Sequence, residues 1–212
     1  MANFMKVQIV MRIPTQRLAK VLAVNNYPAR ERFLRVTDAL GEAGANVTRT
    51  DWSQASASRF KEFEGVVLSG SPDMLSEPQI QSKYRLEMDA IRDSTVPILG
   101  ICFGHQMMAC AFGSRVVKDG EPVHRYVETT ILRPGRLFSG LPRKLSLVES
   151  RHEIVESLPD DFELLAKSET SPIAAMKHRS RPLFGLQSHP ERYSAENPDG
   201  GLVISSFLKL LR

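Results

Sequence analysis

The stretch "PILGICFGHQMMA" (residues 97–109) places a cysteine between two glycines, at the point where an apolar run gives way to a helical pattern. The apolar residues up to Ile101 predict a strand buried on both faces, and the residues from about 104 predict a helix. Gly100 and Gly104 stand two residues before and after Cys102, which is the pattern of a nucleophile elbow with cysteine in place of serine. A structural cysteine needs no such glycines, so we interpret Cys102 as a nucleophile.

The predicted elbow supplies two features that activate a thiol. The first turn of the following helix leaves backbone N–H groups without partners, and the positive end of the helix dipole faces the sulfur. Both favour the thiolate, which is the reactive form of cysteine. The N–H group of Phe103 would then bind the oxyanion that develops when the thiolate attacks a carbonyl group.

Strand-like and helix-like segments alternate through the first half of the chain. Apolar or β-rich runs predict strands at 20–26, 45–50, 65–72 and 96–101, and helical spacing predicts helices at 29–43, at 79–93 and from about 104. This alternation predicts an α/β fold, with a mostly parallel central sheet flanked by helices on both sides. Ligands bind such sheets off the carboxyl ends of the strands, so residues 69–72 and 102–104 should share one rim.

The second half changes character, which predicts a mixed or antiparallel extension of the sheet. Short strand-like runs occur at 124–132, 144–149, 162–168, 173–178 and 182–188, and a closing helix is expected at 199–211. We expect a single domain over residues 20–212. Residues 1–19 are basic and are interpreted as an N-terminal extension or an extra strand; a transit peptide would have a similar composition.

Composition and charge exclude several classes of function. The net charge of +4 is mild, and no run of Lys and Arg interleaved with aromatic residues predicts a nucleic-acid surface. No apolar stretch reaches the roughly 18–20 residues that a membrane helix needs. Cys102 and Cys110 would lie about 12 Å apart along a helix, too far for a disulfide, so a reducing cytoplasmic location is expected. No ligand spacing predicts a metal site.

A nucleophilic cysteine needs a base, and His189 in "LFGLQSHPERY" (183–193) is the best candidate among five histidines. If this run is a strand, Gln187, His189 and Glu191 point to the same side. Glu191 could then accept a hydrogen bond from one ring nitrogen of His189 and leave the other facing the sulfur. A surface His-Pro-Glu turn is the alternative interpretation.

A second oxyanion donor should come from another loop on the same rim. The sequence "LSGSP" (68–72) follows a predicted strand. Gly70 would let the backbone approach closely, and the N–H group of Ser71 could point into the site. An ordinary strand-to-loop turn would have the same composition.

Three motifs in order, "LSGSP", "GICFGHQ" (100–106) and "GLQSHPE" (185–191), together resemble the class I glutamine amidotransferase family over nearly the whole chain from residue 20. The resemblance implies a nucleophile, a base and a third member at Cys102, His189 and Glu191. It also implies substrate and oxyanion contacts, which match Gly70, Ser71, Phe103 and Gln106. The segment "ESRHEIVESLP" (149–159) matches more weakly and implies backbone contacts to the substrate at Arg151 and His152.

The resemblance implies hydrolysis of glutamine without a cofactor, and transfer of ammonia to a separate, ATP-using synthase subunit. No nucleotide-binding P-loop is recognisable in the chain, and residues 136–142 and 177–191 are similar to the glutaminase subunit of GMP synthase. Ser71 and Ser188 depart from the usual family pattern. Both are similar to γ-glutamyl peptidase relatives, so a γ-glutamyl hydrolase with the same three residues is the alternative. Ser188 is expected to point away from His189 and to affect packing or a partner surface.

Overall fold

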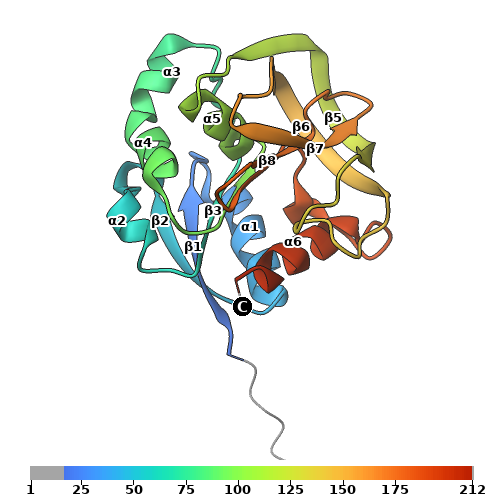
Figure 1. The fold of residues 1–212 in the computed structure, drawn as a ribbon, viewed down its shortest axis with the longest axis horizontal. Coiled ribbons are helices and arrows are strands. Elements are labelled where there is room, and N and C mark those ends of the chain that lie inside the picture. The colour runs from blue at the N-terminus through green and yellow to red at the C-terminus, as the bar shows by residue number, and fades with distance from the viewer. Residues whose placement is uncertain (1–16, 212) are drawn as a thin grey trace, which may run out of the picture.

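The computed structural model describes residues 17–211, which form a central sheet with helices on both faces (Figure 1). The strands are β1 (Ala19–Asn25), β2 (Ala45–Asp51), β3 (Gly65–Leu68), β4 (Ile98–Ile101), β5 (Val116–Ile131), β6 (Lys144–Val155), β7 (Phe162–Ser168), β8 (Ala175–His178) and β9 (Leu183–Leu186). The α-helices are α1 (Arg30–Glu42), α2 (Ala57–Phe60), α3 (Pro78–Lys83), α4 (Arg85–Asp93), α5 (Phe103–Ala111) and α6 (Asp199–Lys209), and two 3-10 helices are Trp52–Gln54 and Pro190–Arg192.

The strands lie in the order β2-β1-β3-β4-β9-β8-β7-β5-β6. The first five are parallel to one another. From β9 onward every neighbouring pair is antiparallel. The predicted α/β fold with a parallel centre and an antiparallel extension is therefore confirmed.

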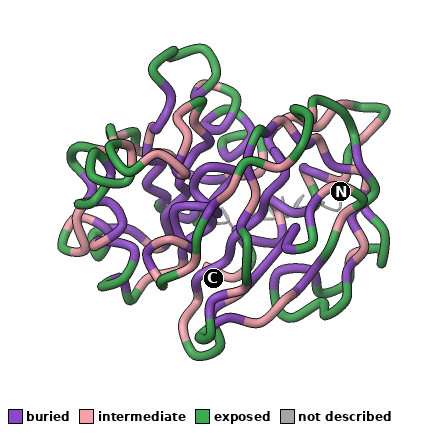
Figure 2. The backbone as a smooth tube through the Cα atoms, turned by 90° about the horizontal axis from the view of Figure 1, so that it is seen from above, coloured by how far each residue is buried: buried purple, intermediate pink, exposed green. Residues whose placement is uncertain are grey.

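The hydrophobic core lies in two layers, one on each face of the sheet. Side chains of β1 alternate between them: Val21 and Ala23 pack with α1 and α6, whereas Leu22 and Val24 pack with α2, α4 and α5. This alternation follows from the period of two residues along a strand. Figure 2 shows the buried backbone concentrated in the middle of the molecule, beneath an exposed rim of loops.

The helix predicted at 79–93 is interrupted at Tyr84, where α3 ends and α4 begins. The Tyr84 ring is almost fully buried and packs at 4.9 Å, centroid to centroid, from both Trp52 and Phe103. Its hydroxyl group donates to Asp73 at 2.9 Å. These tertiary contacts hold the ring in place at the residue where the helix is interrupted.

Strand β6 curls back toward the parallel half of the sheet. Its Val148 carbonyl accepts a hydrogen bond at 2.7 Å from the backbone N–H of His189, which follows β9. The antiparallel extension therefore reaches over the rim on which the candidate site lies.

Two predictions concern the chain as a whole. The basic segment predicted at 1–19 falls mostly on residues 1–16, which lie outside the described residues. Within residues 17–211, no helix combines the length and the apolar character that crossing a membrane requires.

Candidate active site

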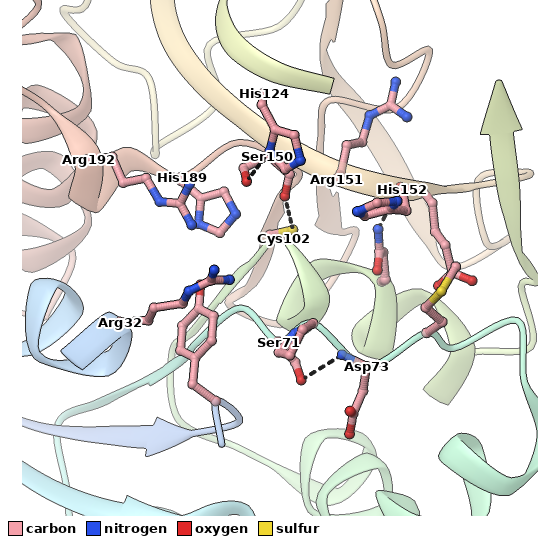
Figure 3. Close-up of a pocket in the computed structure, with 15 residues that line it drawn as sticks. Arg32, Ser71, Asp73, Cys102, His124, Ser150, Arg151, His152, His189 and Arg192 are labelled. Carbon is pink, nitrogen blue, oxygen red and sulfur yellow. Dashed lines mark hydrogen bonds between the residues drawn. The ribbon is translucent and has the colours of Figure 1, made fainter. Parts of the chain in front are cut away.

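The site lies where four parallel strands end, off their carboxyl ends. Tyr27 follows β1, the loop of residues 69–77 follows β3, Cys102 follows β4 and Gln187 follows β9. The sheet therefore brings 69–72 and 102–104 to one rim, as expected for a doubly wound fold. All four lie on or beside the same pocket, which is shown in Figure 3.

Cys102 occupies a strained turn between β4 and α5. Its φ of 51° and ψ of −101° make it the one residue other than glycine with a positive φ among the described residues. Conformations of this kind cost of order 1–3 kcal/mol and are typical of functional sites. Its backbone N–H donates to the Leu186 carbonyl at 2.8 Å, which ties the turn to β9.

The two glycines of the elbow are needed for close approach of the backbone. A Cβ atom on Gly100 would lie 2.5 Å from the carbonyl oxygen of Gly104. A Cβ atom on Gly104 would lie 2.8 Å from the carbonyl oxygen of Leu68, at the end of β3. Each glycine therefore lets neighbouring backbone pack where any side chain would collide.

The sulfur of Cys102 is buried and has polar neighbours. The Nε2 group of Gln187 donates to it at 3.6 Å, and the carbonyl oxygen of Ser150 on β6 lies 3.8 Å away. Gln187 is fully buried and also accepts a hydrogen bond at 3.3 Å from Gln106. Gln187 was not among the site residues predicted from sequence, although its place on the side of His189 and Glu191 was a signal for it.

His189 and Glu191 form a buried pair, with 2.7 Å between Nδ1 and Oε1. Burial alone would lower the pKa of His189, but the Glu191 carboxylate and the Cys102 sulfur raise it to about 10. Burial would raise the pKa of Glu191, but the His189 imidazolium holds it below its ordinary value. His189 is thus favoured in its protonated form beside the Glu191 carboxylate and the Cys102 sulfur.

The local structure around this pair differs from the prediction. Strand β9 ends at Leu186, and residues 190–192 form a 3-10 helix. The expected strand alternation through Glu191 is therefore wrong, because Pro190 begins a tight turn. Glu191 reaches the ring of His189 around that turn. Ser188 is fully buried, so its side chain affects packing and contributes to no surface.

The loop after β3 lies directly against the His189 ring. A Cβ atom on Gly70 would lie 2.9 Å from Cε1 of His189 and would collide with the Tyr27 hydroxyl. Neither the Ser71 nor the Phe103 N–H donates to a protein acceptor among the described residues. Both are therefore free to serve as donors, and their roles stay predictions.

Glu153 on β6 fixes this loop from the other side. Its carboxylate accepts hydrogen bonds from the backbone N–H groups of Leu75 at 2.8 Å and of Ser76 at 3.2 Å. Its backbone carbonyl accepts from Nε2 of Gln106 at 2.8 Å. Gln106 lines the pocket, and the same Nε2 group also reaches Gln187, so its contact with a substrate stays a prediction.

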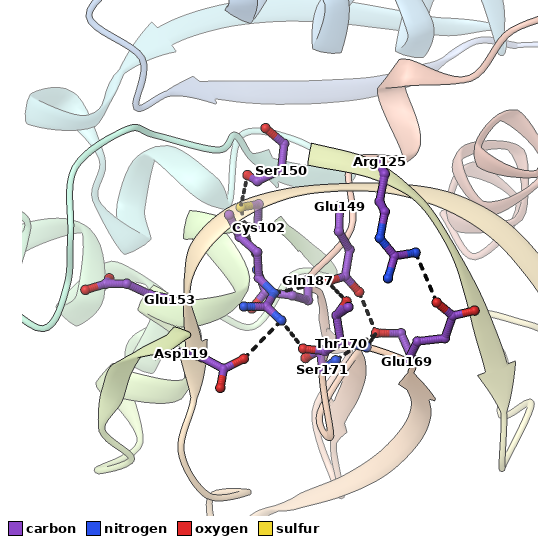
Figure 4. Close-up of polar contacts among 12 residues, drawn as sticks. Cys102, Asp119, Arg125, Glu149, Ser150, Glu153, Glu169, Thr170, Ser171 and Gln187 are labelled. Carbon is purple, nitrogen blue, oxygen red and sulfur yellow. Dashed lines mark hydrogen bonds and ion pairs between the residues drawn. The ribbon is translucent and has the colours of Figure 1, made fainter. Parts of the chain in front are cut away.

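Arg151 and His152 lie differently, because neighbouring residues of β6 face opposite sides. The Arg151 guanidinium is buried and lies away from the sulfur (Figure 3). It pairs at 3.1 Å with Glu149, which is labelled in Figure 4. It also donates to Asp119 at 3.3 Å and to the Thr170 carbonyl. Its side chain is therefore held by partners in the antiparallel extension, although the residue also borders the pocket.

His152 is exposed and lines the pocket beside His124, with 5.8 Å between the ring centroids. The side chains of Tyr27, Arg32 and Arg192 also line it, and sequence reasoning named none of them. Tyr27 directly follows the first predicted strand, which was the one available signal. Arg32 lies on a helix and was not distinguishable from a solvated surface residue.

The remaining thiol and imidazole groups near the elbow are structural. Cys102 and Cys110 are both free cysteines, which confirms that they do not pair. Burial, together with Glu153, raises the pKa of Cys110 to about 12, so this thiol stays protonated. Burial lowers the pKa of His105 to about 3, and the ring packs against Gly185 of β9. Among residues 17–211, no group of three potential ligands could hold a metal ion.

Comparison with known proteins identifies relatives of the chain. The family model described as Glutamine amidotransferase class-I matches residues 32–209. The chain is 40% identical over 147 residues to a subunit of the glutamine-hydrolysing GMP synthase of Thermococcus kodakarensis, and the match covers 69% of this chain and 75% of that one. It is 32% identical over 177 residues to the corresponding protein of Archaeoglobus fulgidus, and that match covers 84% and 91%.

Solved structures have the same architecture. A crystal structure assigned to a GMP synthase subunit from Thermoplasma acidophilum superposes with a TM-score of 0.80 at 28% identity, covering 92% of this chain and 94% of that one. A glutamine amidotransferase from Thermotoga maritima superposes with a TM-score of 0.76 at 17% identity, covering 92% and 98%, which shows the shared fold alone.

Proposed function

The chain belongs to the class I glutamine amidotransferase family, and from this premise we propose that it hydrolyses the side-chain amide of glutamine through Cys102, His189 and Glu191. The observation that carries the proposal is the buried pair of His189 and Glu191, 2.7 Å apart, on the rim that also holds the strained Cys102. A thiol, a protonated imidazole and an orienting carboxylate are the groups that thiol-dependent acyl transfer requires.

In the proposed mechanism, the Cys102 thiolate attacks the side-chain carbonyl carbon of glutamine. The N–H groups of Phe103 and Ser71 stabilise the oxyanion. The raised pKa of His189 keeps it protonated at neutral pH, so it can give its proton to the leaving nitrogen. The C–N bond breaks, ammonia departs and a γ-glutamyl thioester remains on Cys102.

The second half of the reaction returns the enzyme to its starting state. Neutral His189 accepts a proton from water, and the resulting hydroxide attacks the thioester carbonyl. The C–S bond breaks, glutamate leaves, and Cys102 and His189 are again a thiolate and an imidazolium. Glu191 stays ionised throughout and orients the ring.

The ammonia would pass to a separate synthase subunit in the cytoplasm. The relatives with 40% and 32% identity are subunits of glutamine-hydrolysing GMP synthases, which supports the ATP-using part of a GMP synthase as the partner. The test of this part is synthase product formation with glutamine as the nitrogen source. Product must depend on this chain and on Cys102.

The activity itself is tested by glutamate release from glutamine. Cys102→Ala should lower kcat by at least about 1,000-fold, because no other described thiol lines the pocket. Cys110→Ala is the matched control: it removes the other cysteine, which lies on the helix that follows Cys102, and should leave kcat within about twofold. Glutamate release by Cys102→Ala at the wild-type rate would refute the proposal.

A further inference from the structure

The pocket has two sides, which are separated by Cys102 (Figure 3). Ser71, Asp73 and His152 line one side. His189 and Arg192 line the other side, together with Arg32 of α1. If the proposed function is right, the amino-acid end of the substrate lies on the first side. The nitrogen that leaves must then face the second side, because His189 gives it a proton.

On this second side the pocket continues into a hollow of about 360 Å³, which we call the arginine hollow. It is lined by Arg32, Arg35, His124, Ser150 and Arg192. No carboxylate is among these residues, so the hollow has a strongly positive lining. Ser150 lines both the hollow and the pocket, and its carbonyl oxygen lies 3.8 Å from the Cys102 sulfur.

Two of the three guanidinium groups of the hollow have no carboxylate partner, whereas several other arginines among the described residues do have one. Arg115 pairs with Glu156 at 2.8 Å and Arg125 pairs with Glu169 at 3.0 Å. By contrast, neither Arg32 nor Arg35 forms an ion pair with any described residue.

Arg192 is the third arginine of the hollow, and it forms a long ion pair with Glu191. Its Nε lies 3.9 Å from Glu191, whose nearer partner is His189. Its side chain is only 23% exposed, so solvent screens its charge less than that of a fully exposed arginine.

Ammonia would not bind to these guanidinium groups, because it is small and carries no negative charge. A carboxylate does, since guanidinium groups bind carboxylates through paired, charge-assisted hydrogen bonds. We propose that the arginine hollow binds a carboxylate carried by the leaving amine, so that the enzyme also hydrolyses γ-glutamyl amino acids. This inference rests on the proposed function, because it uses the same nucleophile and the same acid.

The reaction balances without any further reactant. The Cys102 thiolate attacks the γ-carbonyl carbon, a C–S bond forms, and the C–N bond to the amino acid breaks. His189 gives its proton to the departing nitrogen, and water then hydrolyses the thioester. The net change is one γ-glutamyl amino acid and one water to glutamate and one free amino acid.

The test compares two substrates that differ in the charge of the leaving amine. γ-Glutamylglycine releases glycine, which carries a carboxylate. γ-Glutamylethylamide releases ethylamine, which is of similar size and has no carboxylate. We expect wild-type kcat/KM to be at least tenfold higher for γ-glutamylglycine. Arg32→Glu should lower this ratio at least tenfold, and the milder Arg32→Gln should lower it about threefold. Adding Arg35→Glu to Arg32→Glu should lower the ratio further.

Arg30→Glu is the control, because Arg30 lies on α1 but lines a different surface hollow beside Asn25 and Thr50. It should leave the substrate ratio unchanged. A wild-type ratio of one or less, or a ratio that Arg32→Glu and Arg32→Gln both leave unchanged, would overturn the inference. Hydrolysis of glutamine in those cases would leave the proposed function standing. If the enzyme hydrolyses none of the three substrates, both the proposed function and this inference are overturned.

Discussion

Replacing Glu153 by alanine removes the carboxylate that receives the backbone N–H groups of Leu75 and Ser76. These hydrogen bonds, at 2.8 and 3.2 Å, hold the loop that carries Ser71 against β6. A hydrogen bond to a charged group contributes about 1.5–3 kcal/mol, and the longer bond is partly exposed, so we expect a loss of about 3 kcal/mol in the free energy of unfolding. For a domain of this size, that corresponds to roughly 6–12 °C in Tm.

The effect on activity should exceed the effect of lower stability alone. If the loop moves, Ser71 no longer presents its N–H to the oxyanion, and removal of one such donor costs about 100- to 1,000-fold in kcat. We therefore expect Glu153→Ala to lower kcat at least 30-fold at a temperature well below its Tm. Glu153→Gln retains one carbonyl oxygen as an acceptor and should give an intermediate loss.

The assay is glutamate release from glutamine, with Tm measured on the same preparations. Glu156→Ala is the control. Glu156 lies close to Glu153 in the sequence, but its side chain is exposed and pairs with Arg115. It should change Tm by no more than about 2 °C, since surface ion pairs contribute little. Wild-type kcat in a folded Glu153→Ala variant would refute the argument that this carboxylate positions the loop.

Three further perturbations test other parts of the structure. Gly104→Ala should destabilise the fold by about 1–3 kcal/mol in urea titrations, because its Cβ would meet the Leu68 carbonyl. Glu191→Gln should lower the pKa of His189 and reduce kcat by about 100-fold or more, and a kcat–pH profile identical to wild type would contradict this. Burial raises the pKa of Glu87 to about 8, so the stability that its proton gives is present below about pH 4.5 and is lost as pH rises to 8. Glu87→Gln should therefore raise Tm relative to wild type at pH 8.5 and not at pH 4.5.

The parallel half of the fold was predictable because its signals are local. The glycines around Cys102 and the apolar runs of β3 and β4 fix a strand, a tight turn and a helix within a few residues. The glycine positions indicate where backbone segments pack closely, and the short distances that a Cβ atom would make at Gly100 and Gly104 agree with this.

The remainder depends on contacts between distant segments. The sequence pattern could not show that Arg151 turns into a buried network with Glu149, because β6 exposes different partners on its two faces. The contact between His189 and Glu191 was expected, but for a strand rather than a 3-10 turn, since residues two apart can meet in both. Tyr84 interrupts the predicted helix, where its ring packs against Trp52 and Phe103, and the spacing of apolar residues along the helix does not reveal such contacts.

The position of β9 beside β4 has a consequence for how the enzyme is made. The two strands are parallel neighbours in the sheet, yet β5 to β8 lie between them in the chain. A ribosome therefore completes Cys102 roughly 90 residues before His189, a delay of roughly 5–20 s at ordinary rates of synthesis. During that interval the nascent chain carries Cys102 without His189, without Glu191 and without the backbone contact between Val148 and His189. The proposed nucleophile is therefore made first, and its proposed partners follow only after the last strand, β9, which enters the middle of the sheet.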